Sequence, residues 1–204
     1  LAAAAIAGID EVFSVGGAQA VAAMAFGTES VRRVDVVAGP GNRYVAEAMR
    51  QVSGSVGVPA AHAGPSEVVV IAGPGTAIEL AAIDLMVQAE HGPGGLAWLV
   101  TWVPEILDAV LNALGDLVAV SPRRAELEAT LSTGGFGCLV DGAEDAIAVA
   151  NAIAPEHLEL LVDDASELLP LVHAAGAVFV GPWSPASLGD YLAGPNLSLI
   201  HISE

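Results

Sequence analysis

The chain has 204 residues, of which 54% are hydrophobic and 15% are charged, and its formal net charge at pH 7 is −18. All six basic residues are arginines, so the chain lacks the broad basic patch of a nucleic-acid-binding protein, and its apolar runs are broken too often to span a membrane. The single cysteine, Cys138, excludes an internal disulfide and a zinc site built from several cysteines, and it is consistent with the reducing cytoplasm.

Short β-rich runs alternate with alanine-rich helical runs along the chain. Apolar, β-branched residues predict strands at 11–15, 34–38, 67–72, 97–102, 137–141, 157–162 and 177–180. Helical periodicity predicts helices at 17–26, 41–52, 76–91, 104–119, 122–133, 143–153 and 164–175. Near-continuous apolar strands between helices indicate an α/β fold with a mainly parallel sheet.

Local signals set several of these boundaries. Thr76 with Glu79 predicts a capping box at a helix start, and Gly92-Pro93 ends the same helix. Pro155 prevents helix 143–153 from continuing past residue 154. The small residues of "AHAGPSE" (61–67) indicate a boundary, so we expect two α/β segments, 1–66 and 67–196.

Two glycine turns precede helices in the first segment. "VGGAQAVAAMAFG" (15–27) places Gln19 in a first helical turn, and "VVAGPGNRYVAEAMR" (36–50) places Asn42 at a helix start. Backbone N–H groups at a helix start favour anions such as the phosphates of a dinucleotide. Neither turn has the G-x-G-x-x-G fingerprint or a P-loop lysine, so on spacing alone an ordinary tight turn is the favoured interpretation.

The helical stretch "DLMVQAEHGPGG" (84–95) presents polar side chains on one face. Gln88 and His91 are three residues apart, and Asp84 lies four residues before Gln88. Such a face is half of a possible divalent-metal site. The alternative is a histidine that interacts favourably with the negative end of the helix dipole.

Two further motifs contain ionisable groups. Glu156 and His157 stand where a helix ends and a strand begins, and the pair is either a general base with a water activator or a solvated junction. Asp190 lies in the Pro/Gly-rich stretch 181–196, where it is either a carboxylate ligand or part of a surface turn.

Six of these motifs occur in the order, and at about the spacing, found in one enzyme family. "GGAQA", "GPGNRYV", "AGPSE", "QAEH", "APEHLEL" and "GDYLAGPN" together resemble the middle of L-histidinol dehydrogenases, over residues 1 to about 196. The resemblance implies a cytoplasmic homodimer with two Rossmann-like domains that lack the usual glycine fingerprint. It also implies zinc- and NAD-dependent oxidation of L-histidinol through L-histidinaldehyde to L-histidine, in histidine biosynthesis.

The resemblance also assigns roles to residues, motif by motif. It implies that Gln88, His91 and Asp190 hold zinc and, with Ser66 and His157, contact the substrate. It implies that Glu156 and His157 are the catalytic pair, and that Gln19 and Asn42 contact NAD.

The match stops after Asn196, where "LSLIHISE" departs from the family pattern. We therefore expect residues 197–204 to be a non-native tail and the chain to be a central fragment with incomplete domains. Two alternatives stay open at this point: a catalytically inactive α/β fragment, and a paralogue that oxidises another amino alcohol.

Overall fold

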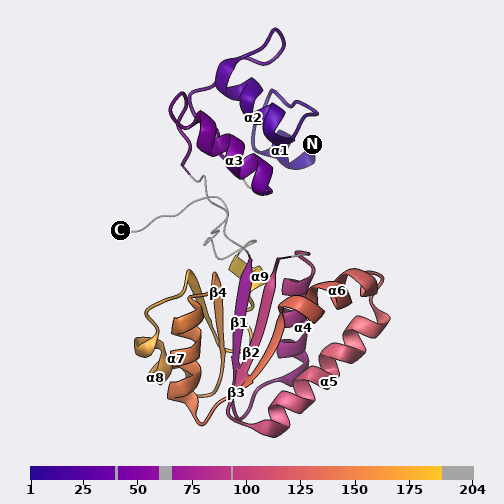
Figure 1. Ribbon diagram of the computed structural model, residues 1–204, viewed down its shortest axis with the longest axis vertical. Helices are drawn as coiled ribbons and strands as arrows, with labels where there is room; N and C mark the ends of the chain where they lie inside the picture. Colours follow the sequence, from indigo (N-terminus) through magenta and orange to yellow (C-terminus); the bar gives the residue numbers. More distant parts are fainter. Residues whose placement is uncertain (40, 60–65, 93, 190–204) are drawn as a thin grey trace. The chain divides into compact units, whose positions relative to one another are not determined.

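A computed structural model describes the chain except for residues 40, 60–65, 93 and 190–204. The chain divides between residues 64 and 65 into two compact units, and each is described by itself. All five strands of the described residues form one parallel sheet with helices around it, which confirms the α/β class (Figure 1). The predicted tail at 197–204 lies outside the described residues.

The first unit contains helices α1 (Ala2–Ile6), α2 (Gly17–Phe26) and α3 (Arg43–Val52). Its small core joins α2 and α3 to the segments between and after them, through Val21, Ala25, Val37, Met49, Val52 and Val56. The described residues of this unit contain one isolated bridge, Val36 to Gly57, and no strand.

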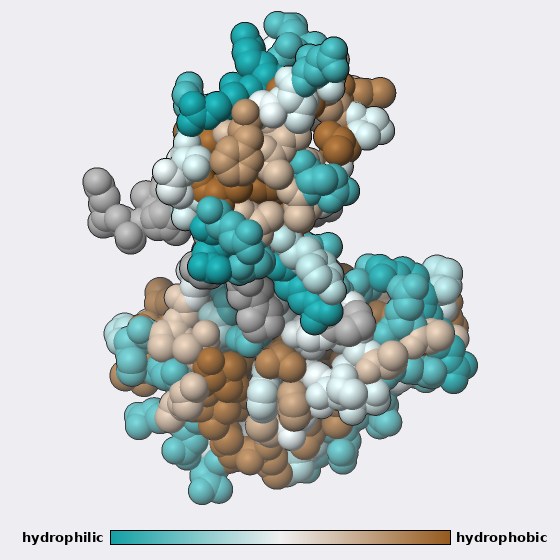
Figure 2. Space-filling view, turned by 45° about the horizontal axis from the view of Figure 1, so that its top comes forward, coloured by the Kyte–Doolittle hydropathy of each residue, from teal (hydrophilic) through white to brown (hydrophobic). Residues whose placement is uncertain are grey.

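The strands predicted at 11–15 and 34–38 are therefore wrong for the described residues of this unit. The backbone of a lone extended segment needs a neighbouring strand for its N–H and C=O groups, and the described part of this unit supplies none. Large apolar residues remain exposed instead, among them Val12, Phe13 and Val15. Figure 2 shows hydrophobic residues at the surface of this unit.

The second unit is built on a five-stranded parallel sheet in the order β3-β2-β1-β4-β5. The strands are β1 (Glu67–Ala72), β2 (Leu96–Thr101), β3 (Gly135–Leu139), β4 (His157–Leu161) and β5 (Ala177–Val180). The five strands predicted between residues 67 and 180 are confirmed to within two residues at each end.

Helices cover both faces of this sheet (Figure 1). On one face lie α4 (Ile78–Ala89), α5 (Pro104–Val120) and α6 (Arg124–Gly134), which pack against Val68, Val70 and Leu99. The other face packs α7 (Ala143–Ile153) and α8 (Ala165–Leu168) against Val69, Ile71 and Leu158. Successive residues of β1 pack against helices on opposite faces of the sheet, because side chains alternate between the two faces of a strand. The short η1 (Leu169–Leu171) follows α8, and α9 (Ala186–Leu188) follows β5.

Three local predictions have clear outcomes. Pro155 does stop α7, which ends at Ile153 with Ala154 in the left-handed region at φ 54°. The helix predicted at 164–175 gives way at Leu169 to η1, because Pro170 lacks the N–H that an α-helix needs. The capping box is wrong: the Thr76 hydroxyl donates instead to the carbonyl oxygens of Gly73 and Leu161. No helix within the described ranges is long and apolar enough to cross a membrane.

Candidate active site at the amino end of the sheet

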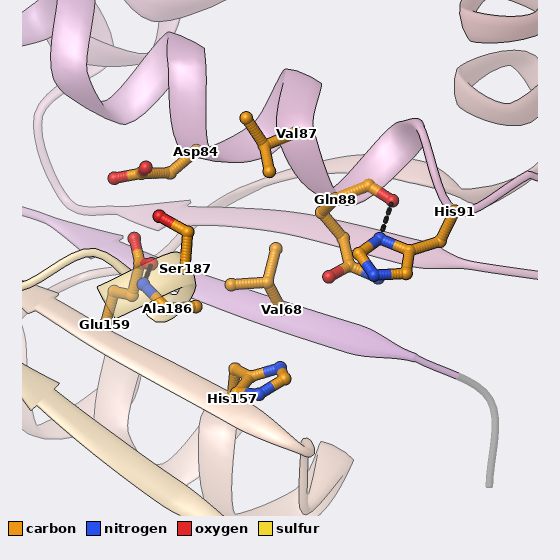
Figure 3. A pocket seen from close by; sticks show the side chains of 9 residues that line it. All are labelled: Val68, Asp84, Val87, Gln88, His91, His157, Glu159, Ala186 and Ser187. Atoms are coloured by element: carbon orange, nitrogen blue, oxygen red, sulfur yellow. Dashed lines mark hydrogen bonds between the residues drawn. The ribbon is translucent and has the colours of Figure 1, made fainter. Parts of the chain in front are cut away.

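The starts of β1 and β4 lie side by side, because Val68 pairs with His157 in the parallel register. Helix α4 runs back along the sheet, so Gln88 in its last turn and His91 just beyond its end come to the same edge. Ser66 immediately precedes β1. A small pocket of about 50 Å³ opens there and includes Gln88, His91 and His157 in its lining (Figure 3). The structure therefore gathers residues from three separate sequence motifs.

Gln88 is buried, with 5% of its surface exposed. Its Oε1 accepts a hydrogen bond from the Ser66 hydroxyl at 3.4 Å, which ties α4 to the start of β1. Its Nε2 has no hydrogen-bond partner in the described part of the chain. A buried polar atom without a partner is uncommon in folded proteins and indicates a place where a ligand can bind.

His91 stands just beyond the end of α4 with its ring against Gln88 (Figure 3). Its Nδ1 lies 3.2 Å from the Gln88 carbonyl oxygen. A carbonyl oxygen only accepts, so Nδ1 carries the proton, and Nε2 keeps its lone pair. This tautomer is the one that a metal-binding histidine adopts when its other nitrogen donates to the backbone.

Glu156 and His157 are adjacent in space as well as in sequence. The Glu156 Oε2 lies 3.7 Å from the His157 Nδ1, and their side chains are 25% and 14% exposed. This Nδ1 has no hydrogen-bond partner among the described residues. Burial raises the pKa of the nearby Glu67 carboxyl, and the charge of Glu156 raises it further. The edge therefore holds an imidazole next to closely spaced carboxyl groups.

Sequence reasoning missed one residue of the pocket, Glu159. It is fully buried, and its Oε1 accepts the backbone N–H of Ala186 at 2.7 Å. Burial, and then the charge of Asp84, raises the pKa of Glu159 to about 8. Burial also raises the pKa of Asp84. The sequence did contain a signal for this residue, because side chains two positions apart on a strand share a face, and Glu159 is two residues after His157.

The remaining predicted site residues, Gln19, Asn42 and Asp190, are not part of the described second unit. Gln19 and Asn42 belong to the first unit, and Asp190 lies outside the described residues. The Asn42 Oδ1 accepts the N–H groups of Tyr44 and Val45, so this residue caps α3. The Gln19 side chain folds back over Gly17, where a Cβ would lie 2.8 Å from the Gln19 Oε1 and where φ is +77°.

The donor set fits a divalent metal in part. Gln88 and His91 offer an amide oxygen and an imidazole nitrogen from one end of α4. In the portion that the structure describes, no group of three or more His, Cys, Asp or Glu side chains is placed to hold an ion. A complete site thus needs a further ligand, which is the role predicted for Asp190.

Comparison with known proteins places the chain in a family. A family model described as histidinol dehydrogenase matches residues 1–200. The chain belongs to the histidinol dehydrogenase family. It is 48% identical over 199 residues to the histidinol dehydrogenase of Parasynechococcus marenigrum (strain WH8102), and this alignment covers 98% of the chain and 45% of the relative.

Two further histidinol dehydrogenases extend this comparison. The relative from Aromatoleum aromaticum is 49% identical over 196 residues, which cover 96% of the chain and 44% of that protein. The crystal structure of the enzyme from Elizabethkingia anophelis superposes with a TM-score of 0.88 at 36% identity, over 96% of the chain and 45% of that structure. The chain thus spans somewhat less than half the length of the histidinol dehydrogenases that it matches.

Proposed function

We propose that this chain forms the core of a cytoplasmic histidinol dehydrogenase that uses zinc and NAD. The reaction is the oxidation of L-histidinol through L-histidinaldehyde to L-histidine, a step of histidine biosynthesis. Family membership supports the activity. The observation that carries the proposal is the convergence of Gln88, His91 and His157 on one pocket, from segments far apart in sequence, with Ser66 hydrogen-bonded to Gln88.

Zinc would be held by the Gln88 and His91 side chains, with Asp190 as a third ligand. When bound, the ion orients the substrate and polarises its hydroxyl group. The Ser66 hydroxyl donates to the Gln88 Oε1 at 3.4 Å, so its oxygen is left to accept a hydrogen bond from the substrate. The unpartnered Nε2 of Gln88 offers a second donor to the same ligand.

The adjacent acid and imidazole divide the proton transfers between them. His157 is partly buried and has a ring nitrogen without a partner, so it is suited to take the proton of the alcohol. Glu156 is more exposed, so it is suited to draw a proton from the water that hydrates the aldehyde. NAD, which Gln19 and Asn42 would hold, would supply the hydride acceptor for each of the two oxidations.

We place the NAD contacts in the first unit, at Gln19 and Asn42. The Asn42 Oδ1 is occupied by the α3 cap, so its side-chain NH2 is the group left to donate to the dinucleotide. Gly17 leaves space for the Gln19 amide at the start of α2. We further propose that the complete enzyme is a homodimer, as the family resemblance implies.

The proposal is tested in a chimaera. The matching segment of the full-length Parasynechococcus marenigrum enzyme is replaced by residues 1–196 of this chain, and NADH formation from L-histidinol is measured together with zinc content. The unmodified relative is the positive control. We expect two NADH for each histidinol consumed and loss of turnover when zinc is removed with a chelator.

Other outcomes distinguish the alternatives. A folded chimaera that oxidises a different amino alcohol in preference to L-histidinol identifies a paralogue. A folded, zinc-loaded chimaera that oxidises no amino alcohol identifies an inactive α/β scaffold. Either result overturns the proposed function.

A further inference from the structure

A buried carboxyl group, Glu159, stands beneath the pocket and has no role in the proton transfers above. None of its surface is exposed, and it pairs in register with Val70 of β1 and Phe179 of β5. Burying a carboxyl group among apolar strands costs free energy unless its oxygens find partners. The contacts of its two oxygens therefore indicate what the residue does.

The first oxygen holds α9. The Glu159 Oε1 accepts the N–H of Ala186, the first residue of α9, at 2.7 Å. Among the described hydrogen bonds, this is the one that ties residues 182–189 to the sheet. The two residues at the start of α9, Ala186 and Ser187, line the pocket. Glu159 thus fixes one wall of the pocket to β4.

The second oxygen faces α4. The Glu159 Oε2 is buried and accepts or donates none of the hydrogen bonds found in the described part of the chain, while the Asp84 and Ser187 side chains point toward the Glu159 carboxyl group (Figure 3). Two carboxyl groups that lie close together do not both ionise readily, and the Asp84 charge raises the pKa of Glu159. When Glu159 is protonated, its Oε2–H can donate a hydrogen bond to the Asp84 carboxylate. Asp84 lies one helical turn before Gln88, so this contact joins β4, α9 and the helix that carries the metal-site residues.

We propose that Glu159 is the positioning residue of this pocket, holding α9 against β4 and α4 so that Gln88 and His91 face a wall of fixed geometry. The inference rests on the proposed function, and it concerns a residue that does not touch the reacting atoms. In sequence, Asp190 follows the end of α9 by two residues.

The test uses two substitutions in the full 204-residue chain. Glu159→Leu keeps the volume and removes both oxygens, whereas Glu159→Gln keeps an acceptor for Ala186 and gains a donor toward Asp84. Two quantities are measured: hydrogen exchange of the Ala186 amide by NMR, and the zinc dissociation constant by competition with a chelating dye. For Glu159→Leu we expect faster exchange at Ala186 and zinc binding weakened about 10- to 100-fold, the range for residues that orient metal ligands. For Glu159→Gln we expect both quantities within about threefold of the unmodified chain.

Thr101→Val is the matched control. Thr101 is also fully buried, and its hydroxyl accepts the N–H of Val103, but it lies at the far end of β2. This change should alter stability without altering zinc affinity or exchange at Ala186. Unchanged exchange and zinc affinity in Glu159→Leu would overturn the inference, as would an equal loss in Thr101→Val. If the unmodified chain binds no zinc, the zinc part of the proposed function fails, while exchange at Ala186 still tests the positioning role.

Discussion

The two ends of the parallel sheet in the second unit both carry acidic residues, and they differ in how those residues are held. At the carboxyl end, a cavity of about 370 Å³ is lined in part by Glu144, Asp163, Asp164 and Glu167, all of them exposed. At the amino end, Glu159 is fully buried and Glu156 is 25% exposed. Of the two ends, as far as the described residues go, the amino end is the one that combines carboxyl groups with imidazole rings and buried polar atoms that lack partners.

The difference matters because open α/β sheets usually bind ligands at the carboxyl ends of their strands, where the strand order reverses. In this sheet that point lies between β1 and β4. Strands β2 and β3 follow β1 on one side, whereas β4 and β5 lie on its other side. At the carboxyl end, however, the loop after β1 packs closely: a Cβ on Gly75 would lie 2.8 Å from the Asp163 carboxylate. Topology alone would therefore favour the carboxyl edge of the sheet, whereas the side-chain chemistry favours the amino edge as the candidate site.

The largest expected effect comes from the catalytic pair at the amino end. In the chimaera, His157→Asn should lower turnover by about 10²- to 10⁴-fold, because a positioned general base contributes on that order. Zinc content should stay unchanged, since the ion is assigned to other side chains. Steady-state NADH formation measures the effect, and Asp163→Asn at the opposite end of the sheet is the control, with turnover unchanged.

The Glu156→Gln variant tests the role of the second member of the pair, because it should affect the two oxidation steps differently. We expect the second step to slow more than the first, so that single-turnover NADH formation becomes biphasic and aldehyde accumulates. Full activity in either variant, or a loss that follows unfolding, would assign the pair to the structure of the junction between α7 and β4.

Leu158 tests the opposite face of the same strand. It is fully buried between His157 and Glu159 in sequence, and it packs with the cluster that includes α7 and α8. Leu158→Ala should lower the free energy of unfolding by about 2–5 kcal/mol, through lost burial and a residual cavity. Urea unfolding followed by tryptophan fluorescence measures this, because all three tryptophans, Trp98, Trp102 and Trp183, belong to the second unit. Zinc affinity of the folded fraction should not change, and a large change would mean that the two faces are coupled.

The pH dependence of stability is the next effect in size. The pKa of Glu159 is raised from 4.5 to about 8 in the folded chain, so between these values the folded state keeps a proton that the unfolded state has lost. This contribution to stability is complete below about pH 4.5 and is lost as the pH rises toward about 8. The slope is at most about 1.4 kcal/mol per pH unit for one proton. The raised pKa of Asp84 acts in the same direction.

Urea unfolding of the full chain at several pH values between 5 and 8 measures this slope. Glu159→Gln cannot lose a proton, so its stability should fall less steeply over the same range. Parallel curves for the two proteins would show that Glu159 does not hold an extra proton in the folded state.

Much of the second unit could be predicted from the sequence, because its strands are nearly continuous apolar runs and several of its helices end close to a glycine or a proline. In the first unit the helices at 17–26 and 41–52 were predicted, but the strand at 11–15 was not found, since the described residues supply no neighbour that pairs with it. The adjacency of Glu156 and His157 was visible in the sequence, whereas the role of Glu159 depends on α9 folding back over β4, a contact between residues 27 apart. Local patterns reveal which side chains share a face, and tertiary packing decides which of them are buried together.

The smallest effect is expected for a substitution at the carboxyl end of the sheet. This substitution tests directly whether the two ends of the sheet differ in ligand binding. Asp164 is exposed and is the residue that precedes α8, but its side chain makes no capping hydrogen bond there. Asp164→Asn should change the free energy of unfolding by less than about 0.5 kcal/mol, as is usual for an exposed position. It should leave zinc affinity of the chain and NADH formation by the chimaera unchanged. A marked loss of either would mean that the acidic cavity at the carboxyl end takes part in ligand binding, because an isosteric change there removes charge and little else.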